Sequence, residues 1–303
     1  MRILITGATG FLGKKLLPAL MERGHDVVAV SRSAERARST LPGLVAAYDW
    51  DPRAEPCPAD ALRVDAVVHL LGESVAGRWT ARKREAIAGS RKEGTRHLVE
   101  GIAALPVGER PKLILSASAV GYYGDRGEEE ITEQTAGGQD FLAEVCSDWE
   151  HEVETAGALG LRWVTMRMPL LVDPDGGALE QMLPLAKLGM GGPLGSGRQW
   201  WCWVSAHDVV RFVVDAVADP SFEGAYNVCS PVPVRQREFA KTLGRVLGRP
   251  AFLPAPAFVL KTVLGAFSIE VLGSKRQIPE RLNERGWEFV DRELEAALRR
   301  MLG

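Results

Sequence analysis

Cysteine and histidine are scarce in this chain, and their scarcity argues against several kinds of site. The 303 residues include four cysteines and five histidines. No two cysteines have the spacing of a metal site or a redox pair. We therefore expect no metal centre and no disulfide, and reduced thiols are typical of a cytosolic protein. The widely scattered cysteines are Cys57, Cys146, Cys202 and Cys229.

An excess of charge of one sign is also missing, as is a long hydrophobic run. The formal net charge of −2 gives no sequence-wide basic field for nucleic acid. The apolar stretch 258–272 is interrupted by Lys261 and Glu270 and is too short to span a bilayer. The first expected strand begins at residue 2, which leaves no room for a signal peptide ahead of it. We expect a cytoplasmic protein, monomeric or homodimeric, with no nucleic-acid or membrane partner.

The most informative motif that is present is Gly7-Ala8-Thr9-Gly10-Phe11-Leu12-Gly13. A short apolar run, 2–6, precedes it, and apolar residues at helical spacing follow over 14–23. In such a turn the first glycine allows a tight bend, the second admits a pyrophosphate, and the third lets helix and strand pack closely. The free N–H groups of the helix then face the phosphates. The motif predicts a dinucleotide site, although its Gly-x-x-Gly-x-x-Gly spacing differs from that of the commonest dehydrogenases.

Strands that alternate with helices predict an α/β fold, a Rossmann-like doubly wound parallel sheet. In such sheets the ligand lies at the carboxyl ends of the strands. The expected strands are 2–6, 26–30, 44–48, 65–70, 112–116 and 162–167, and the expected helices between them are 34–40, 81–104 and 141–158.

Glycine and proline cluster over 175–197, where the character of the chain changes. We interpret 1–172 as the nucleotide-binding domain and 173–303 mostly as a smaller C-terminal substrate lobe, with 203–228 returning to the first domain. The helices expected in this second half are 206–218, 237–247, 256–272 and 291–302.

The segment Ser31-Arg32-Ser33, after the second strand, bears on the identity of the nucleotide. A carboxylate here would hold the ribose 2′-hydroxyl of NAD, and none is present. Arg32 offers a planar cationic group suited to a phosphate, to which the serine hydroxyls add hydrogen bonds. The pattern favours NADP(H) over NAD(H), the alternative being that Arg32 is an ordinary surface residue.

The chain resembles the extended short-chain dehydrogenase/reductases, the NAD-dependent epimerase/dehydratase superfamily. The resemblance includes the glycine motif, Leu70-Leu71-Gly72-Glu73, Ser116-Ala117-Ser118 and Met168-Pro169. It is closer to an atypical branch, the poorly characterised "epimerase family proteins" of bacteria and animals, and covers the whole chain. The marks of that branch are Gly72-Glu73, Arg78-Trp79, Gly89-Ser90-Arg91, Cys146 with Trp149-Glu150, the 191–197 glycine segment, and a C-terminal segment over 249–303.

The resemblance implies an NADP-binding fold with a C-terminal substrate lobe. Independently, a fourth strand ending in Leu-Leu-Gly suits a backbone that passes close to a ribose. Glu73 has the alternative of a helix-start carboxylate, and Arg91 that of a surface arginine. The predicted cofactor-binding residues are Gly7, Thr9, Gly10, Phe11, Leu12, Ser31, Arg32, Leu71, Gly72, Glu73 and Arg91.

The family's chemistry depends on a serine or threonine and on a Tyr-x-x-x-Lys pair. The tyrosine moves the proton of a carbonyl or alcohol, and a spacing of four puts the lysine on the same helix face. Ser118 is where the family's serine would be. The segment 139–154, which should carry the pair, has neither Tyr nor Lys, and the two positions fall on Leu142 and Cys146. A leucine has no proton to give, and a neutral cysteine supplies no ammonium charge.

Two replacements for the missing acid stay open. Tyr122 or Tyr123 could reach the site from the loop after Ser118, and we take Ser118 and Tyr122 as the candidate catalytic residues. Alternatively, Cys146 acts as an acid or simply fills space as a buried thiol.

Aromatic and cationic residues mark the expected substrate pocket. Glycines over 189–197 allow a lid to move, and Arg198, Trp200 and Trp201 follow directly. Tryptophan faces suit a ring or a sugar, and an arginine suits a phosphate or carboxylate. Trp79 is a further pocket candidate. The alternative is a loop whose tryptophans pack against the core.

Two functions are compatible with these features. One is an NADP(H)-dependent oxidoreductase or epimerase that acts on an unknown small molecule without the usual Tyr-x-x-x-Lys pair. The other is a non-catalytic NADP(H)-binding sensor or regulatory protein.

Overall fold

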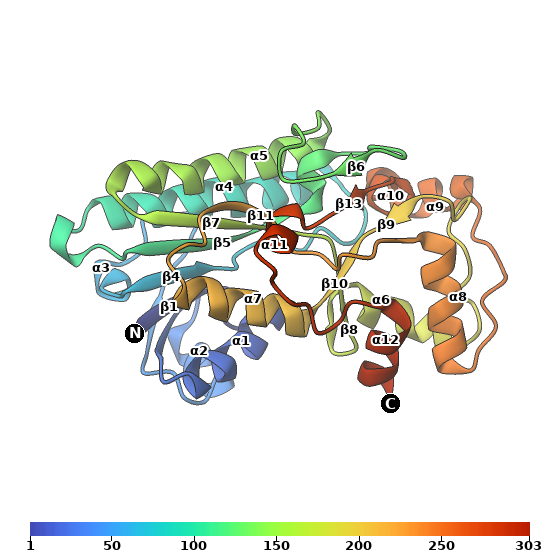
Figure 1. Cartoon of the computed structure of the whole chain (residues 1–303). Coiled ribbons are helices and arrows are strands. Elements are labelled where there is room, and N and C mark those ends of the chain that lie inside the picture. The colour runs from blue at the N-terminus through green and yellow to red at the C-terminus, as the bar shows by residue number, and fades with distance from the viewer.

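The fold is centred on a seven-stranded sheet of order β11-β7-β5-β4-β1-β2-β3 (Figure 1). The computed structural model describes all 303 residues. Every pairing in this sheet is parallel. The strand order reverses between β1 and β4, and ligands of doubly wound sheets bind at such a point. The strands are β1 Arg2–Thr6, β2 Asp26–Ser31, β3 Ala46–Asp49, β4 Ala66–His69, β5 Leu113–Ala119, β7 Arg162–Met168 and β11 Gly224–Asn227.

Helices cover both faces of the sheet, as expected for apolar parallel strands. Helices α1 (Phe11–Glu22) and α7 (Ala206–Ala218) pack on one face, and α4 (Ala81–Ala103) and α5 (Phe141–Glu154) on the other (Figure 1). The short helices α2 (Ala34–Thr40) and α3 (Ala59–Leu62) complete this layer arrangement. The predicted Rossmann-like fold is confirmed.

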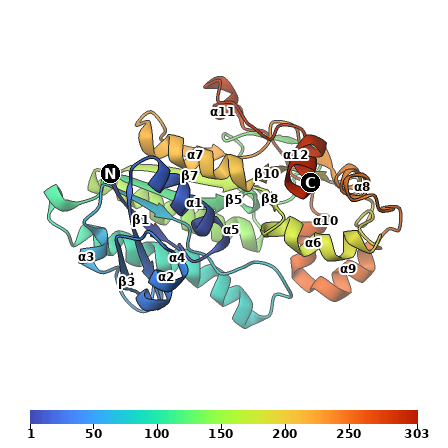
Figure 2. The ribbon, with the colours of Figure 1, turned by 90° about the horizontal axis from the view of Figure 1, so that it is seen from below.

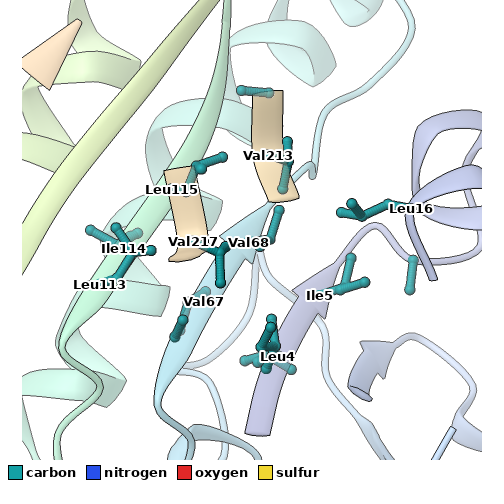
Figure 3. Packing of buried hydrophobic residues seen from close by; sticks show 14 of the residues in the cluster. Leu4, Ile5, Leu16, Val67, Val68, Leu113, Ile114, Leu115, Val213 and Val217 are labelled. Carbon is teal, nitrogen blue, oxygen red and sulfur yellow. The ribbon is translucent and has the colours of Figure 1, made fainter. Parts of the chain in front are cut away.

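The main hydrophobic core lies between the sheet and these helices. Ile5 of β1, Val68 of β4 and Leu115 of β5 are fully buried. Figure 3 shows them beside Val213 of α7 and Leu16 of α1. Because α7 closes this core and β11 pairs with β7, the segment 206–227 contributes both a helix and an edge strand to the main sheet.

A second, smaller core has its own helices: α6 (Gly177–Lys187), α8 (Gln236–Leu247) and α12 (Leu294–Leu302). These helices gather at the end of the molecule away from β1 (Figures 1 and 2). Four short strands connect this end to the sheet: β8 Leu170–Asp173, β9 Trp200–Trp201, β10 Trp203–Ser205 and β12 Val234–Arg235.

The last part of the chain returns to the main sheet. Strand β13 (Arg276–Gln277) pairs with β6 (Glu130–Ile131), and α11 (Glu280–Glu284) packs against β11. The remaining helices are α9 (Ala257–Leu264) and α10 (Ser268–Leu272), with 3-10 turns at Val107–Glu109, Val120–Tyr123, Thr155–Leu159 and Gly265–Phe267.

Two expectations about helices were wrong. The single helix expected over 256–272 is divided into α9 and α10, because Gly265 takes a positive φ of +59°, outside the helical region and accessible mainly to glycine, which ends the first helix. The first helix begins at Phe11, three residues before the expected start, since Gly10 is already its N-cap. Elsewhere the bounds differ by a few residues, as at β3 and α12. No helix has both the length and the apolar character needed to cross a membrane.

Candidate functional site

The turn after β1 depends on all three of its glycines, each for a different reason. Gly7 has φ +68°, and a Cβ there would lie 2.8 Å from the backbone oxygen of Leu70. A Cβ on Gly13 would lie 2.5 Å from the oxygen of Ala8, so α1 packs directly on the turn. A Cβ on Gly10 would meet only the oxygen of Gly7, at 3.0 Å. Gly10 is exposed, and its bare backbone therefore leaves room for a group outside the protein.

The N-terminus of α1 is left open in a way that the N-terminus of α2 is not. At α2, Asp49 accepts a hydrogen bond from Ala34 N (2.7 Å), and Ser33 accepts one from Arg36 N (3.2 Å). At α1, Gly10 provides no side-chain cap, and the first turn has no acidic residue. Its free N–H groups and positive helix end suit a phosphate.

The segment after β4 lies beside this turn, where Leu70 approaches Gly7. Arg91 of α4 donates to the backbone oxygen of Glu73 (3.0 Å) and lies 5.0 Å from the Trp149 ring. Burial lowers the pKa of Arg91. A Cβ on Gly72 would be 3.1 Å from the Arg91 guanidinium, so Gly72 and Arg91 pack together. Arg91 thus packs against the 71–73 backbone and donates a hydrogen bond to it, while the Glu73 carboxylate forms an ion pair with Lys83 (2.6 Å).

Arg32 and Ser31 lie at the end of β2, on the same sheet edge as the glycine turn. Arg32 is exposed, and its side chain forms neither an ion pair nor a hydrogen bond within the protein. The Ser31 hydroxyl accepts from Ser33 N (3.3 Å). Of the remaining predicted residues, Thr9 and Leu12 are half-buried in or just after the turn, and Phe11 packs on Gly176.

Ser118 is buried at the end of β5 and belongs to a polar cluster inside the fold. Its hydroxyl donates to Glu150 of α5 at 2.5 Å. Arg167 of β7 holds the same carboxylate through two of its nitrogens, at 2.9 and 2.7 Å. Burial opposes the charge of Arg167, but the bonds to Glu150 outweigh it and raise the pKa of Arg167. The cluster therefore fixes the orientation of the Ser118 hydroxyl.

The two tyrosines after Ser118 differ in what their hydroxyls contact. Tyr123 is buried, donates to Asn227 (2.7 Å) and accepts from Arg167 (2.9 Å). Burial raises its pKa. Tyr122 is half-buried and presents its ring face to the Arg167 guanidinium, 3.7 Å from the ring centroid. The Tyr122 hydroxyl has no hydrogen-bond partner in the protein, so of the two it is the one free to contact a ligand.

Helix α5 presents no acid at the positions where the resemblance requires Tyr and Lys. Leu142 and Cys146 are both buried, and a Cβ on Gly121 would lie 3.6 Å from the Cys146 sulfur. Burial raises the pKa of the Cys146 thiol to about 12, so it stays neutral near pH 7. All four cysteines are buried free thiols. Cys146 has the surroundings of a packed side chain.

The four predicted pocket residues do not form one cluster. Trp201 is buried in the second core against Phe239. Trp79 is buried between Phe141 and Phe267. Trp200 donates to Glu128 (3.0 Å) and lies under the Arg235 guanidinium, and Arg198 is exposed. The tryptophans are therefore engaged with protein groups, in agreement with the packing alternative, and Arg198 is the most accessible of the four.

Comparison with known proteins identifies the family. Residues 3–229 match the NAD dependent epimerase/dehydratase family, and residues 255–301 match a domain of unknown function, DUF1731. The chain belongs to the NAD-dependent epimerase/dehydratase family. It is 36% identical to "Epimerase family protein SDR39U1 homolog, chloroplastic" of Arabidopsis thaliana, over 100% of this chain and 87% of that protein. It is 34% identical to "Epimerase family protein YfhF" of Bacillus subtilis, over 100% of this chain and 98% of that protein.

Solved structures show the same relationship. The crystal structure of human epimerase family protein SDR39U1 (isoform2) with NADPH superposes with a TM-score of 0.86 at 32% identity, over 99% of both chains. A UDP-glucose 4-epimerase from Thermus thermophilus in complex with NAD has a TM-score of 0.73 at 20% identity, over 100% of this chain and 99% of that chain, which shows the shared fold. The predicted resemblance to the "epimerase family proteins" is confirmed, and the cytoplasmic location stays a prediction.

Sequence reasoning missed the polar groups around Ser118. Glu150 was noted only as a family mark, and Arg167, Asn227 and Gln277 were not singled out. Gln277 donates to the backbone oxygen of Arg167 (2.9 Å) and to Asn227 (2.7 Å). One signal was present: an arginine in the middle of an apolar strand pattern requires a buried partner. The identity of that partner depended on the packing of α5.

Proposed function

We propose that this protein binds NADP(H) and acts as an oxidoreductase or epimerase on a small carbonyl or alcohol substrate. The observation that carries the proposal is the open N-terminus of α1, at the point where the strand order reverses. The exposed, unpaired Arg32 on the same sheet edge favours the phosphorylated cofactor. The human relative, crystallised with NADPH, supports this assignment.

The predicted cofactor residues fit such a group. The backbone N–H groups of Phe11 and Leu12 would hold the pyrophosphate, since that of Gly10 donates to the oxygen of Gly7 (2.9 Å). Arg32 with Ser31 would hold the 2′-phosphate. Gly72, supported by Arg91, would let the backbone approach a ribose.

Titration of NADPH and NADH, followed by tryptophan fluorescence, tests the cofactor proposal. We expect tighter binding of NADPH. Arg32→Ala should weaken NADPH binding roughly 10- to 150-fold, because a charge-assisted contact contributes roughly 1.5–3 kcal/mol. The same change should leave NADH binding unaltered. Arg96→Ala, an exposed arginine on α4, is the matched control. Equal affinities that Arg32→Ala does not change would contradict NADP(H) selectivity.

For the chemistry, we propose Tyr122 as the proton donor. The chemistry that bound NADPH would supply is hydride transfer to a carbonyl carbon, and a group of this chain would then have to deliver a proton to the carbonyl oxygen. The Tyr122 hydroxyl is free, whereas that of Tyr123 is taken by Asn227 and Arg167. The Ser118 hydroxyl donates its one proton to Glu150, so its oxygen would orient the substrate by accepting a hydrogen bond from a substrate hydroxyl. The Arg167 guanidinium packs on the Tyr122 ring, 3.7 Å from its centroid, and so holds the orientation of the phenol.

Label transfer from stereospecifically deuterated NADPH to a carbonyl library tests this step. We expect Tyr122→Phe to reduce transfer by about 10²-fold or more while NADPH binding is retained. Tyr48→Phe, at a tyrosine on β3, is the matched control. If label transfer persists in Tyr122→Phe but stops in Ser118→Ala, Tyr122 is not the proton donor, although the protein is still an enzyme.

A second candidate function is a non-catalytic NADP(H) sensor. It is favoured by α5, whose face presents Leu142 and a neutral, buried Cys146 in place of Tyr and Lys. NADPH binding without label transfer to any compound would favour the sensor over the enzyme.

A further inference from the structure

A large apolar surface lies on the C-terminal part of the molecule. Helix α9 (Ala257–Leu264) is rich in apolar residues, yet none of its residues is buried. The end of α6 and the segment before α9 are exposed in the same way. We define the apolar surface as Leu185, Leu188, Met190, Phe252, Leu253, Phe258, Val259 and Val263.

Backbone contacts join these two segments into one region. A Cβ on Gly189 would lie 3.0 Å from Pro250, and one on Gly192 would overlap the backbone of Leu253. Leu194 forms a bridge with Ala255. The segments 189–194 and 250–255 therefore lie side by side, and α9 follows this contact directly along the chain.

The exposed apolar area of this face is within reach of the largest apolar patches found on monomers. Its eight residues are 39–74% exposed, and both phenylalanines are 72% exposed. At roughly 150–250 Å² for an aromatic side chain, the two phenylalanines alone expose about 200–350 Å², and the six aliphatic side chains add to this area. The largest apolar patch of a typical monomer covers about 300–600 Å² and is often functional. An exposed apolar face of this size indicates a binding surface for another molecule.

The charged residues within the two stretches of chain that carry the apolar surface are all positive. The stretches 181–198 and 246–269 contain no aspartate or glutamate, although the whole chain has a net charge of −2. Lys187, Arg249 and Lys261 are exposed and form no ion pair. Glu270, next along the chain, is paired with the buried Lys275 at 2.9 Å. The partner must therefore be both apolar and negatively charged.

We propose that the apolar surface docks on an anionic lipid bilayer, with α9 lying in the plane of the interface. The apolar side chains would enter the boundary between headgroups and acyl chains, while the three cations contact acidic headgroups. A second copy of this chain fits less well. A two-fold contact places the same patch on both sides and would bring like cations together. The docking is peripheral and involves no membrane-spanning helix.

Vesicle flotation tests the proposal with the full-length protein. We expect binding to mixed phosphatidylcholine–phosphatidylglycerol vesicles and at least about tenfold weaker binding to pure phosphatidylcholine vesicles, because the cations contribute only at an anionic surface. Added salt should weaken binding to the mixed vesicles. Equal partition to both vesicles, or to neither, would overturn the proposal.

Two variants identify the surface responsible. Lys187→Glu/Lys261→Glu should reduce binding to mixed vesicles about tenfold or more, and Phe252→Ser/Phe258→Ser should abolish it. Lys92→Glu/Arg96→Glu, on α4, is the matched charge-reversal control and should bind like the wild type. Unchanged NADPH binding and circular dichroism show that each variant is folded. Vesicle binding that persists in both test variants overturns the assignment to this face.

Light scattering after gel filtration tests whether a second copy of this chain, rather than lipid, covers the apolar surface. A dimer that Phe252→Ser/Phe258→Ser converts to a monomer, without vesicle binding by the wild type, would show that the face joins two copies and would overturn the lipid proposal.

Discussion

Glu150 and Arg167 form a buried ion pair directly behind Ser118. Nη2 of Arg167 lies 2.7 Å from Oε2 of Glu150, and both side chains are almost fully inaccessible to solvent. Ser118 and Arg167 are register partners on β5 and β7, so the pair reaches Ser118 from the neighbouring strand and from α5. A buried ion pair of this kind adds little net stability, because the desolvation of the two charges offsets their attraction. Its contribution is to hold the neighbouring side chains in one arrangement.

The first prediction concerns this pair. Arg167→Met should destabilise the fold by about 3–5 kcal/mol, because it leaves the buried Glu150 carboxylate without its cation, and only the Ser118 hydroxyl still donates to it. Adding Glu150→Gln should recover part of that loss, since the remaining group is neutral. Urea denaturation of the single and double variants measures both effects. For comparison, Arg96→Ala removes one half of an exposed pair and should cost no more than about 1 kcal/mol. If the losses of stability caused by Arg167→Met and Glu150→Gln simply add in the double variant, the two residues are not energetically coupled.

A second prediction separates the roles of two glycines in the turn. Gly10→Ala should weaken NADPH binding about tenfold or more with little loss of stability, because φ is −74° and the added Cβ meets only the oxygen of Gly7. Gly13→Ala should lower the free energy of unfolding by about 2 kcal/mol or more, since its Cβ would overlap Ala8. Fluorescence titration and thermal unfolding of both variants check this. A stable Gly13→Ala protein would show that α1 does not need its close approach to the turn.

A third prediction concerns the pH dependence of stability. His69 is buried at the end of β4 between Thr6 (2.7 Å) and Thr95 (3.0 Å), and burial lowers its pKa from 6.5 to about 3. Between these two pH values the unfolded chain binds a proton at His69 that the folded chain does not. Stability is therefore lost as the pH falls below about 6.5, by at most about 1.4 kcal/mol per pH unit from this residue.

Denaturation curves of His69→Asn between pH 7 and about pH 4.5 test this linkage. The variant should be less stable at pH 7, because it disturbs the contacts with Thr6 and Thr95, and its stability should depend less steeply on pH. His151→Asn, an exposed position on α5, should keep the slope of the wild type. Parallel curves for His69→Asn and the wild type would mean that His69 titrates normally in the folded protein.

The parts of this structure that could be predicted are those that depend on local pattern. The glycine turn lies between a strand and a helix within a few consecutive residues, so its geometry follows from the residues themselves. The bounds of α2 and α7 were predicted to the residue; each begins after a serine N-cap, and α7 also has a clear apolar periodicity. The helix over 256–272 was mispredicted because an apolar run does not reveal which glycine takes a positive φ.

The surroundings of the candidate residues could not be predicted from local sequence pattern. Ser118, Glu150 and Arg167 are separated by up to about fifty residues in sequence and meet because β5, β7 and α5 pack together. Tyr122 and Tyr123 are adjacent in sequence, yet one hydroxyl is free and the other is bonded to Asn227 of β11. Trp200 and Trp201 likewise differ, one stacked under Arg235 and the other buried in the second core.

By itself, the sequence determined the Rossmann-like fold, the nucleotide-binding turn and the absence of a Tyr-Lys pair in the segment that forms α5. These follow from short-range pattern, because strand, turn and helix preferences act over a few residues. Only the tertiary structure decided which hydroxyls are free, which charges are paired and which apolar side chains remain exposed. Those properties depend on groups that are distant along the chain, and burial and pairing are set by how the helices and strands pack around them.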